Sequence, residues 1–337
     1  MNRDAEISLR KLDHLRICTQ EEVDFRKTNG FEGYEFEQMA LPEADFDEID
    51  LSTRFLDHDF ALPFFIEALT GGAAGTEKIN RNLAEAAQAV KIGLGLGSQR
   101  AMLLDPGWTY TYQVRDVAPD IFLLGNLGGA QLAKCGPDQV AGLVRDVGAD
   151  GMAIHLNPLQ ELIQPEGDRD WRGFLEALEK LCREAHFPVV VKEVGHGISG
   201  PMAARLEAAG VAAIDVAGAG GTSFARVEYY RGGETAKAFF EWGIPTAASL
   251  RACRKAVSIP LVASGGIRNG VECAKALAMG AGLVGFGRPL LLAALDSPGK
   301  VIQEISRLAG ELKTAMLLVG TRNIRELQQR SLVARMT

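Results

Sequence analysis

Polar and glycine residues follow nearly every short apolar run of this 337-residue sequence, and these residue types can bind ligands and move protons. They stand at Asn126 and at residues 70–72, 97–100, 155–157, 192–193, 218–222, 264–268 and 287–288. In α/β barrels the ligand lies at the carboxyl ends of the strands, so residues that follow successive strands meet there. One such group is weak evidence, but their recurrence predicts a single binding site at one end of the strands.

The segment 155–161 holds the densest set of chemical groups: His155, Asn157, Gln160 and Glu161. His155 and Asn157 are two residues apart on one predicted strand, so their side chains project from the same face. A lone strand histidine is more often a hydrogen-bonded core residue. Four polar groups so close together favour a binding or catalytic role. Glu161 is a carboxylate of the kind that holds Mg²⁺ together with substrate phosphates.

Two glycine-containing loops predict a phosphate site. Gly265 and Gly266 precede one predicted helix, and Gly287 and Arg288 follow the last predicted strand. Barrels often bind phosphate with these loops and a helix N-terminus, because free N–H groups and the helix dipole favour an anion. The alternative is that the glycines only make tight turns.

Basic residues stand in two unexpected places. Lys192 ends the otherwise apolar strand PVVVKEV, where a lysine is costly unless it meets an anion or a polar ring edge. Its alternative role is a salt bridge to a carboxylate at a neighbouring strand end. Arg10, Lys11 and His14 fall on one predicted helical turn, and such a cluster is usually a solvated face.

The elements that must position these residues alternate regularly from residue 62 onward. Short apolar runs separated by amphipathic segments indicate βαβ units and a parallel sheet that is buried on both faces. Eight runs fit a closed (β/α)8 TIM barrel better than a six-stranded doubly wound sheet. The runs are 62–69, 92–96, 121–127, 151–157, 188–194, 213–217, 260–263 and 283–286. The segment between the second and third runs is a poor helix.

Three segments depart from this alternation, and we expect all of 1–337 to form one barrel domain. Residues 1–61 are predicted to be an N-terminal extension packed on the barrel, with a helix over 8–23. Residues 224–243 interrupt the sixth unit and are predicted to be an active-site lid. Residues 323–333 are predicted to be a closing helix.

The composition excludes several classes of protein. The net charge of −7 argues against a nucleic-acid binder. Five widely spaced cysteines without a C-x-x-C pair encode neither a disulfide framework nor a zinc site. No stretch reaches the ~18 apolar residues of a membrane span, and the charged N-terminus lacks the apolar region of a signal peptide. We therefore expect a cytoplasmic protein with neither a nucleic-acid nor a membrane partner.

The chain resembles the type 2, FMN-dependent isopentenyl diphosphate isomerase family over nearly its whole length. The motifs are RKLDH at 10–14, LTGG at 69–72, GSQR at 97–100, GNLG at 125–128, HLNPLQE at 155–161, VKEVGHGIS at 191–199, GAGGTSFARVE at 218–228 and SGGIRNG at 264–270. Together they are highly specific, although SGGIR alone is shared by many FMN barrels. Leu69 replaces an expected methionine, a harmless swap of similar volume, and His196 occupies a variable position.

This resemblance implies roles for individual residues. The FMN-binding residues would be Leu69, Thr70, Gly71, Ser98, Asn126, Lys192 and Thr222, with Gly265, Gly266, Ile267, Arg268, Gly287 and Arg288 around the phosphate. The substrate diphosphate would be bound by Arg10, Lys11, Ser98, Gln99, Arg100, His155, Asn157, Gln160 and Arg226. Glu161 would bind Mg²⁺. The catalytic residues would be Lys192, His155 and Gln160.

The resemblance also implies the reaction. Members of the family interconvert isopentenyl and dimethylallyl diphosphate, in isoprenoid biosynthesis, by a 1,3-allylic proton shift. Their FMN must be reduced by NADPH or NADH, and it then acts as acid and base without net redox change. Lys192 would stabilise the anionic reduced ring. The family forms homotetramers and homo-octamers.

Rival hypotheses concern other proteins of this fold. An FMN-dependent α-hydroxy-acid oxidase or dehydrogenase needs a histidine base near the flavin, and residues 218–228 contain none. A purine-nucleotide dehydrogenase needs a loop cysteine, whereas Cys253 lies in a helical pattern. A non-catalytic flavin-binding protein would not need Arg10, Lys11, Gln160 or Glu161.

Overall fold

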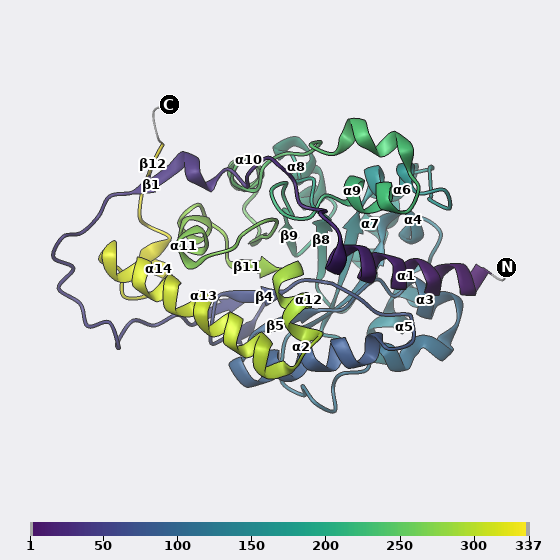
Figure 1. Ribbon diagram of the computed structural model, residues 1–337, viewed down its shortest axis with the longest axis horizontal. Helices are drawn as coiled ribbons and strands as arrows, with labels where there is room; N and C mark the ends of the chain where they lie inside the picture. The colour runs from purple at the N-terminus through teal and green to yellow at the C-terminus, as the bar shows by residue number, and fades with distance from the viewer. Residues whose placement is uncertain (1–2, 335–337) are drawn as a thin grey trace.

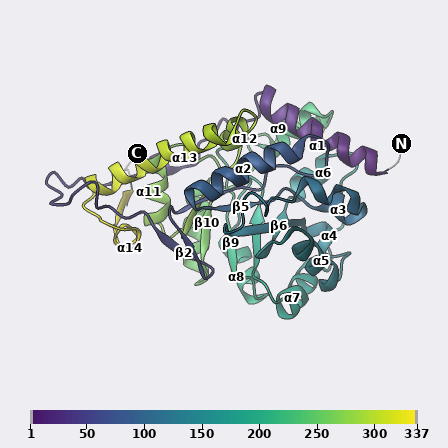
Figure 2. The ribbon, with the colours of Figure 1, turned by 90° about the horizontal axis from the view of Figure 1, so that it is seen from below.

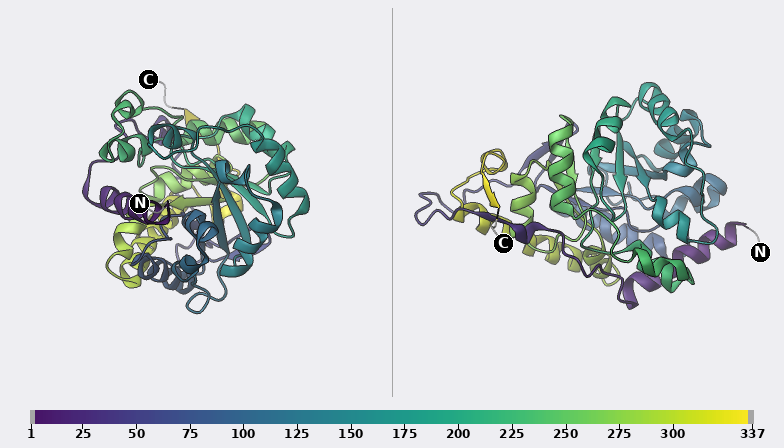
Figure 3. Two further views of the ribbon diagram at one scale, coloured as in Figure 1. Left: turned by 90° about the vertical axis from the view of Figure 1, so that its right-hand side faces the viewer. Right: turned by 90° about the horizontal axis from the view of Figure 1, so that it is seen from above.

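Eight parallel strands form a closed barrel in the computed structural model, which describes residues 3–334 (Figures 1 and 3). Seven of the eight predicted apolar runs contain one strand each, and the strand of the run 121–127 ends one residue beyond it, so the predicted barrel is confirmed. The strands are β4 (Phe64–Ile66), β5 (Gly93–Gly95), β6 (Leu123–Gly128), β7 (Gly151–Leu156), β8 (Val189–Glu193), β9 (Ala213–Asp215), β10 (Leu261–Ala263) and β11 (Leu283–Phe286). The barrel closes where β11 pairs with β4.

The strand register places the predicted site residues beside one another. Apolar side chains fill most of these strands because both faces of a parallel barrel sheet are buried. In the ladder His155 of β7 pairs with Lys192 of β8, and Lys192 pairs with Asp215 of β9. Three ionisable side chains therefore stand on adjacent strands near their carboxyl ends.

Helices surround the barrel in the order expected of βα units. They are α2 (Thr76–Val90), α3 (Arg100–Leu104), α4 (Gly129–Leu132), α5 (Pro137–Val147), α6 (Pro158–Ile163), α7 (Phe174–Glu184), α8 (Gly200–Ala208), α10 (Thr246–Ala256), α11 (Gly270–Ala278), α12 (Arg288–Ala294) and α13 (Pro298–Leu318). Between β5 and β6 only α3 and the 3-10 turn η2 (Pro106–Thr111) form, as the poor helical pattern there predicted. The long α13 packs along α2, α11 and α12 (Figure 2).

The N-terminal extension begins with a helix at the barrel mouth and continues to a hairpin that packs into the main core. Helix α1 (Arg3–Gln20) contacts α3 and α9 (Phe224–Tyr230). The chain continues through η1 (Phe31–Gly33) and β1 (Tyr34–Phe36) to the hairpin β2 (Thr53–Phe55) and β3 (His58–Phe60). The hairpin packs Phe55 and Phe60 into the main core. Helix α1 thus starts five residues before the predicted helix over 8–23 and ends three residues before the end of that prediction.

The predicted closing helix over 323–333 is wrong. Residues 324–327 form a short helix, α14 (Ile324–Leu327), and the chain then becomes β12 (Leu332–Ala334). β12 pairs antiparallel with β1, which joins the last residues to the N-terminal extension. This partner is 298 positions away along the chain, so no local pattern could indicate it.

The predicted lid segment, 224–243, forms α9 and the 3-10 helix η3 (Glu234–Phe239). It packs against α6, and α9 also contacts α1. Phe224, at the start of α9, lines the mouth of the barrel. Among the described residues, no helix combines the length and the apolar character needed to cross a bilayer.

Candidate active site

Two adjoining cavities open at the carboxyl ends of the strands. One, of about 140 Å³, is lined by basic and amide side chains, and we call it the cationic cavity. The other, of about 340 Å³, is lined by the loops after β9, β10 and β11, and we call it the glycine-lined cavity. Both are lined by Cys18, Ala68, Leu69, Lys192, Val194, Phe224 and Leu291. Lys192 therefore stands at their junction.

Backbone forms much of the wall of the glycine-lined cavity. Gly265 and Gly266 have φ values of +106° and +72°, which disfavour any other residue. A Cβ atom on Gly265 would lie 2.1 Å from the carbonyl oxygen of Gly218, and one on Gly266 would lie 2.3 Å from Gly220. These glycines thus allow two loops to pack directly on each other and expose backbone to the cavity. The other predicted FMN residues that line this cavity are Leu69, Lys192, Thr222, Ile267, Arg268, Gly287 and Arg288.

Two arginines on this wall share one carboxylate that the sequence analysis missed. Arg268 Nη2 lies 2.9 Å from Asp24 Oδ2, and Arg288 Nη1 lies 3.1 Å from Asp24 Oδ1. Arg288 also donates through Nε to the carbonyl oxygen of Cys18 at 2.6 Å. Asp24 forms an isolated antiparallel β-bridge with Thr222. The segment that follows α1 is therefore part of the cavity wall.

Lys192 is held between two carboxyl groups at the top of the barrel interior. Its Nζ lies 3.4 Å from Glu67 Oε2 and 3.5 Å from Asp215 Oδ2, and it donates to the carbonyl oxygen of Glu193 at 2.7 Å. Burial opposes its charge, but Glu67 and Asp215 outweigh burial and raise the pKa of Lys192. The salt-bridge alternative is therefore realised, and Lys192 still lines both cavities.

His155 is a neutral imidazole in the cationic cavity. Burial, and next the nearby Lys192, Lys11, Arg10 and Arg100, lower the pKa of His155 to about 3. Its Nδ1 lies 2.8 Å from Asn126 Oδ1. Because a carbonyl oxygen can only accept, this contact leaves the proton on Nδ1 and directs Nε2 elsewhere as an acceptor.

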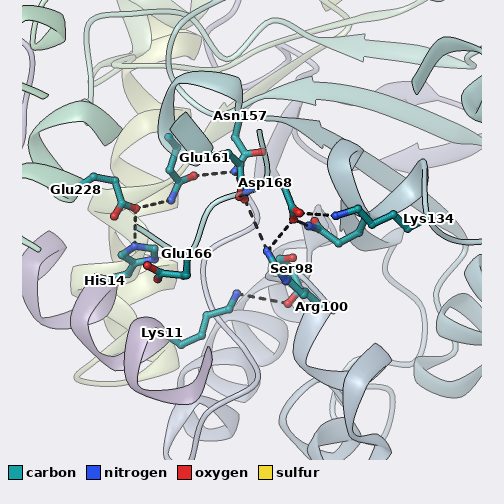
Figure 4. Close-up of polar contacts among 12 residues, drawn as sticks. Lys11, His14, Ser98, Arg100, Lys134, Asn157, Glu161, Glu166, Asp168 and Glu228 are labelled. Carbon is teal, nitrogen blue, oxygen red and sulfur yellow. Dashed lines mark hydrogen bonds and ion pairs between the residues drawn. The ribbon is translucent and has the colours of Figure 1, made fainter. Parts of the chain in front are cut away.

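Three cations face the cationic cavity from two elements. Arg10 and Lys11 come from α1, and Arg100 begins α3. Lys11 Nζ reaches the carbonyl oxygen of Ser98 at 3.4 Å (Figure 4). Burial, followed by repulsion from Arg10 and Arg100, lowers the pKa of Lys11 to about 7. The basic turn of the extension is therefore part of the site, and the solvated-face alternative does not hold.

Glu228 of α9 organises the far side of the cavity, and the sequence analysis assigned it no role. Its side chain is fully buried and binds His14, Gln160 and Arg231 at 2.8, 2.9 and 2.7 Å. Burial would raise its pKa, yet these partners lower the pKa of Glu228 to about 2. Burial lowers the pKa of His14, so the pair joins a neutral imidazole to a carboxylate. A carboxylate within the recognised 218–228 segment was the signal that could have identified it.

Glu161 lines the same cavity and belongs to a network of side chains. Its Oε1 accepts from Asn157 Nδ2 at 3.2 Å, and its Oε2 accepts from the backbone N–H of Asp168 at 2.7 Å. Asp168 in turn binds Gln131 at 2.8 Å, Lys134, and Arg100 at 3.4 Å (Figure 4). No cluster of three or more metal-ligating side chains occurs in residues 3–334. A cation at Glu161 would therefore need ligand or water oxygens.

Most predicted site residues line a cavity, but three have other surroundings. Gln99 is fully buried, donates to the carbonyl of Leu143 at 3.0 Å and accepts from the N–H of Asn126 at 2.9 Å. Arg226 binds Glu241 at 2.8 Å and lies over the ring of Phe240. Gly71 is not in either lining, because Tyr112 packs against its backbone.

The remaining predicted residues lie together at the barrel mouth. Those that line the cationic cavity are Arg10, Lys11, Leu69, Thr70, Ser98, Arg100, Asn126, His155, Asn157, Gln160, Glu161 and Lys192. His196, whose role was left open, is buried against Phe25 and lies outside both linings. Most residues predicted to hold a flavin thus line the glycine-lined cavity, but Thr70, Ser98 and Asn126 line the cationic cavity together with most of the predicted diphosphate residues.

Comparison with known proteins decides the family. Residues 148–334 match the FMN-dependent dehydrogenase family. The isopentenyl-diphosphate delta-isomerase of Thermococcus kodakarensis is 46% identical over 98% of this chain and 92% of its own length. That of Synechococcus sp. is 48% identical over 92% of each chain. The chain belongs to the isopentenyl-diphosphate delta-isomerase family, in its type 2, FMN-dependent form.

The fold is shared more widely than the family. A mandelate oxidase matches 99% of both chains with a TM-score of 0.68 at 18% identity, and the lactate oxidase of Pediococcus acidilactici matches with 0.66 at 19%. Such identities show a common barrel only. The isopentenyl-diphosphate isomerase interpretation is therefore favoured over the α-hydroxy-acid oxidase alternative, and the chain is an isomerase.

Proposed function

We propose that this protein interconverts isopentenyl diphosphate and dimethylallyl diphosphate by an allylic proton shift that depends on reduced FMN. The observation that carries the proposal is the junction of two cavities at Lys192, one cationic and one lined by glycine backbone. A diphosphate needs several cations to offset its charge, and Arg10, Lys11 and Arg100 supply them. A hydroxy-acid substrate would not need this set.

The residues of the glycine-lined cavity fit FMN. A Cβ atom on Gly265 or Gly266 would meet the backbone of the loop after β9, so these glycines let the two loops pack together, and both line the cavity that would hold the phosphate. Arg268 and Arg288 would bind the phosphate, with Asp24 as their present partner. Bound and reduced, FMN would supply both the acid and the base of the double-bond shift. We propose NADPH as the reductant.

The protein's own side chains bind the diphosphate, orient neighbouring groups and limit the access of water. Arg10, Lys11 and Arg100 hold the diphosphate, and neutral His155 can accept a hydrogen bond at Nε2 without adding charge. Glu228 accepts a hydrogen bond from the amide of Gln160 and so fixes its orientation. Lys192 places a buried positive charge beside the site of an anionic ring, where low dielectric strengthens it. Helix α1 and Phe224 limit the access of water.

Glu161 is the proposed Mg²⁺ ligand. One carboxylate and phosphate oxygens are a common way to bind Mg²⁺, which keeps several waters. Asn157 and the N–H of Asp168 hold the Glu161 carboxylate in place. Arg100 lies 4.0 Å from Glu161 and 3.4 Å from Asp168, so a diphosphate would meet the metal and Arg100 together. We further propose a cytoplasmic homotetramer or homo-octamer.

The proposal is tested by isomerisation of isopentenyl diphosphate with FMN, Mg²⁺ and NADPH, each omitted in turn. Product should form only with reduced FMN and should fall steeply without Mg²⁺. A chain that oxidises lactate or mandelate and does not isomerise would support the oxidase alternative. Turnover that is independent of FMN would exclude the proposed chemistry.

A further inference from the structure

The top of the barrel interior contains one buried ammonium and two buried carboxyl groups. The side chains of Lys192, Glu67 and Asp215 are 12%, 10% and 4% exposed. Two carboxylates around a single ammonium leave an uncompensated negative charge, which is costly in a low-dielectric interior. Two carboxyl groups that share a site relieve this cost when one of them keeps its proton.

The hydrogen bonds decide which carboxyl group keeps the proton. Asp215 Oδ1 accepts from the hydroxyl of Ser264 at 2.7 Å and from the N–H of Ala217 at 3.2 Å. Donors of this kind stabilise a carboxylate. Among the described residues, no backbone N–H or hydroxyl donates to either oxygen of Glu67. Asp215 is therefore the ionised carboxyl group of the pair. A charge on Glu67 would be stabilised by Lys192 alone.

We propose that Glu67 is a neutral carboxylic acid that faces Asp215 and serves as a positioning residue for Lys192. This inference rests on the proposed function, because it concerns the charge that Lys192 presents to a flavin. Burial, and next the charge of Asp215, raise the pKa of Glu67 to about 8, while Lys192 acts in the opposite sense. With Glu67 neutral, Lys192 and Asp215 balance each other.

Packing keeps the Glu67 carboxyl group in this place. A Cβ atom on Gly285 of β11 would lie 2.1 Å from Glu67 Oε1, so the strand passes directly against the carboxyl group. The ionisable groups that face Glu67 are Lys192 of β8 and Asp215 of β9. Glu193 and His155 also interact electrostatically with Lys192.

A charge on Glu67 would reach the cofactor site. Glu67 and Lys192 both line the glycine-lined cavity. Ionisation of Glu67 would give the cluster a net negative charge and would disfavour an anionic reduced flavin. The cluster thus favours reduced FMN below about pH 8 and loses this preference at higher pH.

The first test needs no flavin. Glu67→Gln is uncharged at every pH, so its unfolding free energy relative to the native sequence reports the ionisation of Glu67 in the full chain. In the native sequence the unfolded state releases this proton near pH 4.5, whereas the folded state keeps it until about pH 8. Stability of the native sequence should therefore fall, relative to Glu67→Gln, as pH rises from about 4.5 to about 8, and should then level. A difference that stays constant over this window would overturn the proposal.

A second measurement covers the case in which Glu67→Gln fails to fold. The infrared spectrum of the native chain at pH 6 should contain the carbonyl stretch of a protonated carboxylic acid, and this band should disappear by pH 9.5. Absence of the band at pH 6 would mean that Glu67 is ionised and would overturn the proposal.

The third test uses the ratio of the dissociation constants of oxidised and reduced FMN. At pH 6.5, Glu67→Gln should match the native chain within about twofold, because Glu67 is already neutral. At pH 9.5 the variant should favour reduced FMN by about tenfold more than the native chain, equivalent to about one pKa unit of interaction. A comparable gain at pH 6.5 would show an ionised Glu67 and contradict the inference.

Glu207→Gln is the matched control for both experiments on the variant. Glu207 lies on α8, binds Ser258 and is part of neither cavity lining. The Glu207→Gln variant should leave the ratio of the dissociation constants of oxidised and reduced FMN unchanged at both pH values. If neither the native chain nor Glu67→Gln binds FMN, the proposed function fails. The stability and infrared measurements still decide whether Glu67 is protonated.

Discussion

His14 and Gln160 contact the same oxygen of one carboxylate, Glu228 Oε1, at 2.8 and 2.9 Å (Figure 4). His14 lies on α1, Gln160 on α6 and Glu228 on α9. The N-terminal extension, the helix that follows β7 and the predicted lid segment therefore meet at one buried group. Arg231 holds the second oxygen of Glu228 at 2.7 Å, which leaves Glu228 little freedom to move.

Glu228→Gln should lower kcat and leave FMN binding unchanged. The amide would present a donor to His14 or Gln160, so Gln160 would lose its fixed orientation. Loss of one charge-assisted hydrogen bond costs about 1.5–3 kcal/mol, or about 10- to 100-fold in rate. Steady-state kinetics and an FMN titration measure the two effects. An unchanged kcat would mean that Glu228 only supports the fold.

Glu161→Gln should keep the fold and FMN affinity and should lose at least about 100-fold in kcat/KM, because the diphosphate loses its metal contact. The dependence of rate on Mg²⁺ concentration is the specific readout. A matched control is Glu176→Gln, which changes a carboxylate on the first turn of α7. If Glu161→Gln kept the native rate and the native Mg²⁺ dependence, Glu161 would not be a ligand of the metal.

Diphosphate binding should take up close to one proton at pH 8. The pKa of Lys11 is about 7 in the free cavity, so at pH 8 most of the chains carry a neutral Lys11. A diphosphate raises this pKa, and affinity is therefore highest below pH 7 and weakens as pH rises above it. Calorimetry in buffers of different ionisation enthalpy measures the uptake.

The control for Lys11 is Lys11→Arg, because arginine stays charged at a pKa above ~12. When inorganic diphosphate binds, Lys11→Arg should take up fewer protons than the native chain. The difference should be nearly the whole proton that Lys11 takes up at pH 8. Equal uptake in the two proteins would show that Lys11 is already charged in the free protein.

Lys192→Ala should weaken FMN binding modestly and lower turnover far more. A fixed cation beside an anionic ring in a dry site is worth several kcal/mol in the reduced state. The ratio of the dissociation constants of oxidised and reduced FMN separates this effect from general loosening, since only reduced FMN should lose affinity strongly. Equal losses for the two forms would indicate a purely structural lysine.

The sequence predicted the barrel because each strand is a local apolar run, and each of the eight runs matches one strand to within a residue at its carboxyl end or contains it. Local pattern also placed His155 and Lys192 near strand ends and Glu161 shortly after one. It could not show that β12 pairs with β1, or that Asp24 binds Arg268 and Arg288, because these contacts join distant segments. Glu67 and Asp215 were missed as ionisable partners for the same reason, whereas Glu228 stood within a recognised motif and was not assigned a role. Gln99 stands in a recognised motif, yet its amide binds backbone groups.

The account depends most on the flavin acting as acid and base rather than as a scaffold. The direct measurement is isomerisation by the protein reconstituted with reduced 5-deaza-FMN, whose ring lacks the basic nitrogen N5. Binding of the analogue should match that of FMN, because the groups lining the glycine-lined cavity are unchanged, and turnover should be abolished. Normal turnover with 5-deaza-FMN would contradict the account and would assign the proton transfers to His155, Gln160 and Glu161.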